Sequence, residues 1–205
     1  MVRLGFYIDT SSCSGCKTCQ VACQDKNDLK PGQHWRRIYE IEAGEWVKEG
    51  AKWTGVPHSW YVSISCNHCS EPSCVDACPT GAMTITEEGV VIVNHDRCMG
   101  CGYCNWACPY DAPRMNKEAG KMSKCDFCID KIRMGLNPVC VDSCPMRALD
   151  FGPLDKLRKK YGDERDIFPL PDSAITSPSV VIKKHKNSYK ESKAYISNRE
   201  ELTDA

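Results

Sequence analysis

The stretch CMGCGYCNWACPY occupies residues 98–110 and places four cysteines directly before a proline. Two, two and three residues separate these cysteines, which are Cys98, Cys101, Cys104 and Cys108. The chain has 205 residues and 16 cysteines, and the cysteines are counted in its hydrophobic fraction of 41%. Aliphatic core material is therefore scarcer than that fraction indicates, and we expect something besides a hydrophobic core to hold the chain together.

All 16 cysteines fall into four groups of this kind, with none left over. Group one is Cys13, Cys16, Cys19 and Cys23; group two is Cys66, Cys69, Cys74 and Cys78; group three is Cys98, Cys101, Cys104 and Cys108; group four is Cys125, Cys128, Cys140 and Cys144. Every group begins with CxxC and ends with CxxxC, and the middle gap lengthens to four residues in group two and eleven in group four. A proline follows groups two, three and four, at Pro79, Pro109 and Pro145, whereas Gln24 follows group one.

Three chemistries use cysteines in such numbers. Disulfides suit small secreted proteins, but this chain is long, shows no secretion signal, and spaces its cysteines badly for pairing with one another. Structural zinc uses two CxxC pairs and needs neither a third nearby cysteine nor the proline. A C-x₂-C-x₂-C-x₃-C-P run is typical of iron–sulfur ligation. Four such groups, with no Trp, His or Asp in a ligand position, predict four [4Fe–4S] clusters.

In a ferredoxin run the first three thiolates bind one cluster and the fourth binds its neighbour. Groups two and three are close in sequence and should pair, which leaves groups one and four to pair across the whole chain. The expected ligand sets are Cys13, Cys16, Cys19 and Cys144 for cluster 1; Cys66, Cys69, Cys74 and Cys108 for cluster 2; Cys98, Cys101, Cys104 and Cys78 for cluster 3; and Cys125, Cys128, Cys140 and Cys23 for cluster 4. Metal binding then crosslinks each pair of groups.

This pairing predicts an α+β fold with two ferredoxin-like modules of two [4Fe–4S] clusters each, one module inserted within the other. The inner module covers residues 66–114, and the outer module is assembled from residues 1–30 and 115–152. Residues 31–65 are expected to form a β-rich insertion with hairpins. Residues 153–205 are expected to form a short helix and a C-terminal extended arm.

Short strands are expected between the cysteine groups. Met83–Thr86 and Val90–Val93 flank a Glu-Glu-Gly turn and predict a hairpin. Ile38–Glu42 alternates, and Trp60–Ser65 is rich in aromatic and β-branched residues, so both read as strands.

The C-terminal quarter has a different character. The segment PLDKLRKKYGDE predicts a short helix entered at Pro153. From about residue 170 the chain is polar with scattered prolines, which is compatible with a solvated tail or with an arm lying over a partner. We expect the arm, because Val180–Ile182 would be unusual in a free tail.

Basic residues near the cysteines are candidates for tuning cluster potentials. An oxidised cluster with four thiolates carries about −2, so four contribute on the order of −8 to a chain whose 27 Lys and Arg balance its 27 Asp and Glu. Positive charge nearby favours the reduced form of a cluster. The candidates are Lys17, Arg97, Arg114, Lys124, Lys131 and Arg147, although an ordinary surface charge is the simpler interpretation of any single one.

Three further side chains lie inside the groups. His68 lies between Cys66 and Cys69, but cysteines complete the ligand count, so we expect the imidazole to point outward. Tyr103 and Trp106, in group three, are expected to pack around a cluster and exclude water from it.

Several function classes lack support in the sequence. The balanced charge gives no basic face for nucleic acid, and no apolar run approaches the roughly 18 residues that cross a bilayer. We find no dinucleotide fingerprint, P-loop or Ser-His-Asp arrangement, so no catalytic residue is expected. The N-terminus shows neither a cleavable apolar segment nor paired arginines, so export is expected to depend on a partner that carries the signal.

Several segments beyond the quartets carry a family resemblance: GFYIDTSSCSGCKTCQVAC, RRIYE, SISCNHC, CPTGAM, CMGCGYCNWACPY, KCDFC and CPMRALDFGP. Over most of its length the chain resembles the iron–sulfur (B) subunits of the dimethyl sulfoxide reductase family. The resemblance implies a subunit that relays electrons from a quinol-oxidising integral membrane anchor to a molybdopterin catalytic subunit that reduces dimethyl sulfoxide or a related S- or N-oxide. The quartets alone are shared by many relatives, so they do not identify the substrate.

The resemblance also implies a peripheral place on the cytoplasmic membrane. The periplasmic face is expected if a partner's twin-arginine signal carries both chains, and the cytoplasmic face stays open. Polysulfide and thiosulfate reductase subunits share this architecture and are alternatives. A free polyferredoxin and a zinc-bound interaction module are alternatives of other classes, and metal content and copurifying chains distinguish them.

Overall fold

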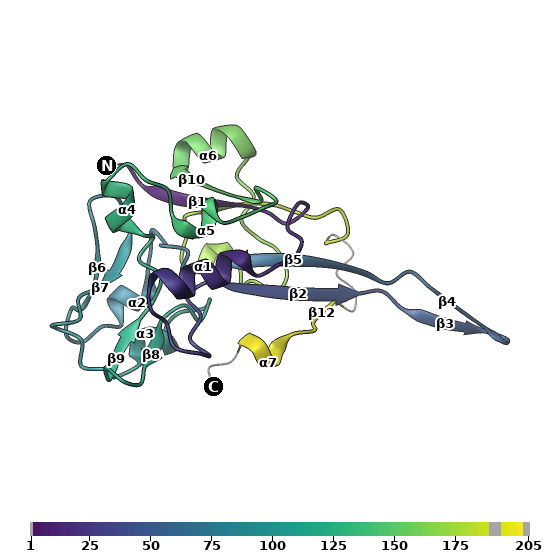
Figure 1. The fold of residues 1–205 in the computed structure, drawn as a ribbon, viewed down its shortest axis with the longest axis horizontal. Helices are drawn as coiled ribbons and strands as arrows, with labels where there is room; N and C mark the ends of the chain where they lie inside the picture. The colour runs from purple at the N-terminus through teal and green to yellow at the C-terminus, as the bar shows by residue number, and fades with distance from the viewer. Residues whose placement is uncertain (1, 189–193, 203–205) are drawn as a thin grey trace.

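Small sheets and short helices make up the computed structural model, which describes residues 2–188 and 194–202 (Figure 1). The first sheet has the order β10 (Leu149–Pro153), β1 (Leu4–Asp9), β11 (Val180–Lys183). The second sheet has the order β12 (Tyr195–Ile196), β2 (Arg37–Ala43), β5 (His58–Ile64). Three hairpins pair β3 (Trp46–Glu49) with β4 (Lys52–Gly55), β6 (Met83–Ile85) with β7 (Val91–Val93), and β8 (Arg114–Asn116) with β9 (Lys121–Ser123). This mixture of helices and small, mainly antiparallel sheets is the α+β class expected from the sequence.

The helices are short and lie mostly beside cysteines. They are α1 (Thr18–Lys26), α2 (Ser73–Asp76), α3 (Tyr103–Trp106), α4 (Ile129–Arg133), α5 (Val139–Asp142), α6 (Leu154–Tyr161), the 3₁₀ turn η1 (Ser173–Ile175) and α7 (Arg199–Leu202). The helix expected after Pro153 is confirmed: α6 begins at Leu154, directly after that proline.

The prolines after the cysteine groups explain why three helices stop early. In α2, α3 and α5 the helix ends two residues before the fourth cysteine of its group, and a proline follows that cysteine. A proline cannot continue a helix, and it disfavours helical backbone in the residue before it. Group one has Gln24 instead, and α1 continues through Cys23 to Lys26. The group without the proline therefore has the nine-residue helix α1, whereas α2, α3 and α5 have four residues each.

Strand β1 is buried along its whole length because both of its faces are covered. Phe6 stacks on Phe127, with ring centroids 4.1 Å apart. On the other face Tyr7 stacks on Tyr161 of α6, with centroids 3.6 Å apart. β10 pairs with β1 antiparallel and β11 pairs with it parallel, so β1 is the centre of the first sheet.

The C-terminal segment departs from the expectation of an arm lying over a partner. Residues 180–183 form β11 within the first sheet, and Val180, Val181 and Ile182 are buried. The apolar run therefore completes the chain's own core, which explains its hydrophobicity. Further along, β12 pairs with β2, and Asn198 donates from Nδ2 to the carbonyl of Ile38 at 2.8 Å. The part of the tail at residues 189–193 and 203–205 lies outside the described residues.

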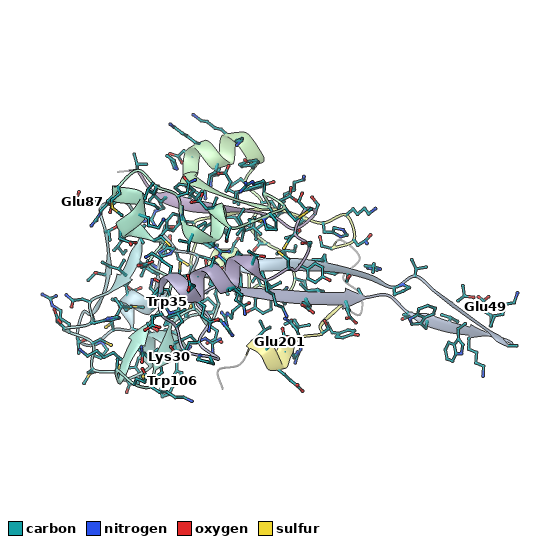
Figure 2. The ribbon with its side chains drawn as sticks, viewed as in Figure 1. Lys30, Trp35, Glu49, Glu87, Trp106 and Glu201 are labelled. Carbon is teal, nitrogen blue, oxygen red and sulfur yellow. The ribbon has the colours of Figure 1, made fainter. Side chains whose placement is uncertain are left out.

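The expected strands between the groups are confirmed, with small shifts of their ends. Ile38–Glu42 and Trp60–Ser65 correspond to β2 and β5, and Met83–Thr86 and Val90–Val93 correspond to β6 and β7. Between β2 and β5 the chain forms the β3–β4 hairpin, which projects away from the body with Glu49 near its tip (Figures 1 and 2).

Candidate metal centres

The four CxxC loops share one backbone feature, a left-handed residue just before the second cysteine. The φ values are 70° at Gly15, 44° at His68, 73° at Gly100 and 65° at Phe127. A left-handed residue reverses the chain within a few atoms, which turns both cysteines of a loop toward one side. Glycine takes this conformation without strain, and a Cβ at Gly15 would also meet the Tyr61 ring at 2.5 Å. The sequence repeat is therefore a repeat of geometry.

The fourth cysteine of each group also has a recurring partner. In groups two, three and four its sulfur accepts a hydrogen bond from the backbone N–H four residues later, by the pairs Ala82–Cys78 (3.2 Å), Ala112–Cys108 (3.5 Å) and Ala148–Cys144 (3.3 Å). Group one has no proline, and there the side chain of Asn27 lies 3.7 Å from the Cys23 sulfur. Such N–H groups stabilise a charged sulfur, which is the form that binds metal.

Two apolar cavities are each lined by four cysteines. The lining cysteines are Cys13, Cys16, Cys19 and Cys144 in the first cavity, and Cys78, Cys98, Cys101 and Cys104 in the second. Each cavity thus combines the first three cysteines of one group with the fourth cysteine of another. These are the members expected for clusters 1 and 3.

The remaining eight cysteines are close enough to influence one another's ionisation. The pKa of Cys69 is raised to about 12, chiefly by burial; Cys66 and Cys108 contribute to the rise, and a hydrogen bond from Thr176 opposes it. Cys74 has thiols of the same expected set as neighbours, and burial raises its pKa as well.

Group four has the fourth cysteine of group one as its neighbour. Burial raises the pKa of Cys23 to about 12, and Cys140 and Cys128 add to the rise. Cys23 in turn raises the pKa of Cys125, after burial. Thiols of the sets expected for clusters 2 and 4 therefore lie near one another, although the ligand sets themselves stay a prediction.

The donor set fits iron–sulfur clusters on chemical grounds. All 16 thiols are free, and burial holds most of the shifted ones in the neutral form. Buried thiolates need a cation to compensate their charge, and iron bound by four sulfurs supplies it. Within the described residues, no three His, Cys, Asp or Glu side chains are close enough together to hold a single metal ion.

Exposure distinguishes the groups. Cys16 and Cys101 are exposed, and every other cysteine is buried or half-buried. Both exposed thiols are the second cysteine of a group with unbroken 2-2-3 spacing, so groups one and three reach the surface.

Two hydroxyl groups contact cysteine sulfurs from distant parts of the chain. Thr176 donates from Oγ1 to the Cys69 sulfur at 3.2 Å, and Ser63 lies 3.4 Å from the Cys19 sulfur. Neither hydroxyl is close in sequence to the sulfur that it contacts, so no local pattern identifies them. Only the packing of β5 and the C-terminal segment against the cysteine loops brings them there.

The expectation that His68 points outward is wrong. Its side chain is 0% exposed, and its Nδ1 accepts a hydrogen bond from the N–H of Val91 at 3.1 Å. Burial lowers the pKa of His68 well below its usual value, and the nearby ammonium of Lys124 adds to the effect, so the ring is neutral. The left-handed backbone of the CxxC loop explains the burial, because it turns this position toward the interior.

The expectation for Tyr103 and Trp106 is also wrong. Their side chains are 49% and 79% exposed, and their rings contact each other at 5.5 Å instead of enclosing a cavity (Figure 2 shows Trp106 at the edge of the molecule). Met99, in the same group, is exposed too. All three belong to the same cysteine group as the exposed thiol of Cys101.

The basic candidates separate into surface and buried residues. Arg97 and Arg147 are exposed, Lys131 is partly exposed, and Lys17 forms ion pairs with Glu40 and Glu201 at 3.3 and 2.5 Å. Lys124 is buried, and its ammonium donates to the backbone carbonyls of Val91 and Cys125.

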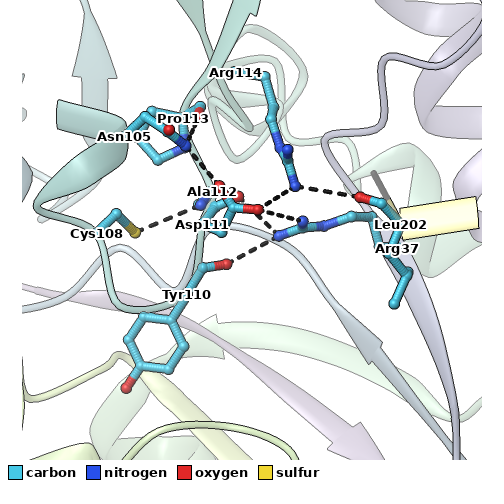
Figure 3. Close-up of polar contacts among 9 residues, drawn as sticks. All are labelled: Arg37, Asn105, Cys108, Tyr110, Asp111, Ala112, Pro113, Arg114 and Leu202. Carbon is cyan, nitrogen blue, oxygen red and sulfur yellow. Dashed lines mark hydrogen bonds and ion pairs between the residues drawn. The ribbon is translucent and has the colours of Figure 1, made fainter. Parts of the chain in front are cut away.

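Arg114 is buried within a small polar network (Figure 3). Its guanidinium and that of Arg37 converge on the carboxylate of Asp111, and Arg37 also donates to the carbonyls of Tyr110 and Asp111 at 2.9 Å. Asn105 donates to the same carboxylate and to the carbonyl of Pro113. The network fixes the segment that follows Cys108, so the role of Arg114 is structural.

No helix in the described parts of the chain has both the length and the apolar character needed to cross a bilayer.

Comparison with known proteins finds two matches to models of a 4Fe-4S dicluster domain, at residues 12–83 and 58–154. The B subunit of anaerobic dimethyl sulfoxide reductase from Escherichia coli (strain K12) is 49% identical over 202 residues, which are 98% of each protein. The protein of the same name from Haemophilus influenzae is 49% identical over 187 residues, 91% of each protein. The formate dehydrogenase iron-sulfur subunit of Haemophilus influenzae is 35% identical over 80% of this chain and 55% of its own length. On this similarity along nearly its whole length, the protein belongs to the family of dimethyl sulfoxide reductase iron–sulfur (B) subunits, with ferredoxin-type 4Fe-4S domains.

Proposed function

We propose that this chain is the electron-transfer subunit of a respiratory molybdoenzyme. It would relay electrons through four [4Fe–4S] clusters from a quinol-oxidising membrane anchor subunit to a molybdopterin catalytic subunit that reduces dimethyl sulfoxide or a related S- or N-oxide. The observation that carries the proposal is the placing of 16 free cysteines in four repeated loops, with two sets of four cysteines each lining one cavity. The names of the relatives support the choice of complex.

The proposed ligand sets are those expected from the spacing. The two four-cysteine cavities support clusters 1 and 3, and the mutual effects of neighbouring thiols support clusters 2 and 4. The nested arrangement, with residues 66–114 inside residues 1–30 and 115–152, belongs to the same proposal. Its support is that α1 packs against α5 and that Cys144 lines the group-one cavity.

Bound clusters supply one-electron storage at potentials that their surroundings adjust. The chain's own residues do the rest: thiolates would hold the iron, and the core around β1 buries Cys19, Cys66, Cys125, Cys140 and Cys144. Hydrogen bonds from Ala82, Ala112, Ala148 and Thr176 stabilise charge on the sulfurs.

Partner proteins would approach at the two exposed thiols. Cys16 and Cys101 are the points where the expected clusters 1 and 3 come nearest to solvent. The apolar surface of Met99, Tyr103 and Trp106 beside Cys101 has the aromatic composition of a protein interface. We place the subunit on the periplasmic face of the cytoplasmic membrane, carried there by a partner's twin-arginine signal.

The test is anaerobic purification from the native host, with iron, molybdenum and zinc measured beside the copurifying proteins. The proposal predicts about 16 iron atoms per chain, four for each of four clusters, together with molybdenum and a large partner. Dimethyl sulfoxide, polysulfide, thiosulfate and N-oxides are then assayed as electron acceptors. Full iron without molybdenum or a partner would favour a free polyferredoxin, and stoichiometric zinc with little iron would exclude electron transfer.

A further inference from the structure

Arg36, at the start of the long β2–β5 hairpin, has its guanidinium in the interior of the protein. The residue is 1% exposed and lies over the Phe6 ring, with its guanidinium carbon 4.9 Å from the centroid. It donates from Nη1 to the carbonyl and hydroxyl of Ser63 at 3.2 and 3.1 Å, and from Nη2 to the hydroxyl of Ser65 at 3.0 Å. Three hydrogen bonds and an aromatic ring therefore fix this cation in one orientation.

Among the residues that the structure describes, the buried guanidinium has no carboxylate partner. The arginines that form ion pairs in this part of the chain are Arg37, Arg114, Arg133, Arg158 and Arg165. Its neighbour Arg37 is also buried but pairs with Asp111. A buried charge left uncompensated costs several kcal/mol, so the counter-charge of Arg36 must come from another source.

Cysteines of two groups lie in the same buried cluster as Phe6, the ring under this guanidinium; they are Cys19, Cys125 and Cys140. Ser63, which accepts from Arg36, also lies 3.4 Å from the sulfur of Cys19. Burial alone would lower the pKa of Arg36, but negative charge on the sulfurs of nearby cysteines raises it overall; in order of effect these are Cys140, Cys19, Cys125 and Cys23. In the proposed ligand sets Cys19 belongs to cluster 1, and the other three belong to cluster 4.

We infer that Arg36 is the shared counter-charge of clusters 1 and 4, a positioning residue that stabilises the reduced forms of both. The inference rests on the proposed ligand sets. Each oxidised cluster carries about −2, and each added electron increases the negative charge next to a cation that water does not screen. Removing that cation therefore makes both clusters harder to reduce. No local pattern in the sequence indicates this role, because Arg36 is far from every cysteine along the chain.

The test uses the intact complex carrying Arg36→Gln, Arg36→Lys or, as a matched loss of charge at the surface, Arg133→Gln. Arg133 pairs with Glu88 at 2.9 Å on the exposed face of α4. Iron content is measured first, and the four cluster potentials are then followed by redox titration with electron paramagnetic resonance. We expect Arg36→Gln to lower two of the four midpoints and leave the other two in place. Arg36→Lys and Arg133→Gln should leave all four near their wild-type values.

Three outcomes would overturn the inference: full iron with unchanged midpoints in Arg36→Gln, an equal shift of all four midpoints, or the same shift in Arg36→Lys. If Arg36→Gln binds less iron, the same titration is made on Ser63→Asp. This variant keeps Arg36 but places a carboxylate beside it, which neutralises its charge. Lower midpoint potentials for two clusters in Ser63→Asp, with no change in Ser63→Asn, would support the inference. Unchanged midpoint potentials in Ser63→Asp would contradict it. Wild-type iron far below about 16 per chain would refute the proposed function itself, so the two failures are distinguishable.

Discussion

The imidazole of His68 lies edge-on against the ring of Phe127, with centroids 5.1 Å apart and ring planes at 74°. The two residues hold the same left-handed position in the CxxC loops of groups two and four. Phe127 also stacks on Phe6, so one aromatic cluster joins two cysteine loops to the central strand of the first sheet. The repeat in the sequence thus places its second and fourth copies in contact.

Phe127→Ala should destabilise the loaded protein strongly. Phe127 is 1% exposed, and truncating a buried phenylalanine typically costs about 3–5 kcal/mol through lost contacts and the cavity left behind. Thermal denaturation of the anaerobic complex measures the effect, with Val56→Ala, on the exposed hairpin, as the control. A shift no larger than that of the control would contradict the central place of this ring.

Substitution of single cysteines should reveal how the groups pair. Cys144→Ser is expected to alter the same electron paramagnetic resonance signal as Cys13→Ser, because both thiols line one cavity. Cys23→Ser should alter the signal changed by Cys125→Ser. If Cys144→Ser and Cys125→Ser affected the same cluster instead, each group would bind its own cluster and the proposed exchange of fourth ligands would be wrong.

Gln24→Pro should shorten α1. The helix runs from Thr18 to Lys26 because group one lacks the proline of the other groups. A proline inside a helix removes a hydrogen bond and clashes with the preceding turn, at a cost of about 3 kcal/mol or more. We expect a lower unfolding temperature in Gln24→Pro than in the control Gln24→Ala. Equal unfolding temperatures would show that the last turn of α1 contributes little.

Asp111→Asn should lower the free energy of unfolding, because two buried guanidinium groups lose the charge of the carboxylate that they share. Arg37 and Arg114 share the Asp111 carboxylate, and hydrogen bonds to charged groups contribute about 1.5–3 kcal/mol each when buried. Because Asp111 itself is half exposed, we expect a loss near the lower figure in urea denaturation of the loaded protein. Glu118→Gln, in an exposed ion pair with Lys30, is the control and should change little. If Asp111→Asn lost no more stability than Glu118→Gln, solvent would be replacing the carboxylate as a partner of the two guanidinium groups.

Shortening the projecting hairpin should leave metal binding intact. Residues 45–56 contain no cysteine, and β3 and most of β4 are exposed. Replacing this segment by an Asn-Gly turn keeps the pairing of β2 with β5. We expect the same iron content and visible absorbance as in the intact protein. A loss of iron would show that the hairpin supports the clusters.

Local patterns predicted local structure well. Patterns of alternation and β-branched residues indicated β2 and β5, and the turn between Thr86 and Val90 indicated the β6–β7 hairpin. Contacts between distant segments could not be read in this way. Val180–Ile182 looked like part of an arm because its partner, β1, lies at the other end of the chain.

The side chains whose placement differs from expectation show the same limit. His68 is polar and lies between two expected ligands, yet its neutral ring is buried because the loop backbone turns it inward. Tyr103 and Trp106 are aromatic, yet they are exposed beside Cys101. Arg36 is not among the basic candidates because no cysteine lies near it in the sequence, whereas charge acts through space.

The late position of β11 in the chain has a consequence for biosynthesis. The first sheet lacks one edge, and Cys69 lacks the hydroxyl of Thr176, until residues 176–183 have emerged from the ribosome. A nascent polypeptide can therefore present its group-two thiols to an iron donor before the last strand covers them. In the complete fold the segment leading into β11 lies against the group-two loop, where the N–H groups of Ser70 and Glu71 donate to the carbonyls of Ser177 and Thr176.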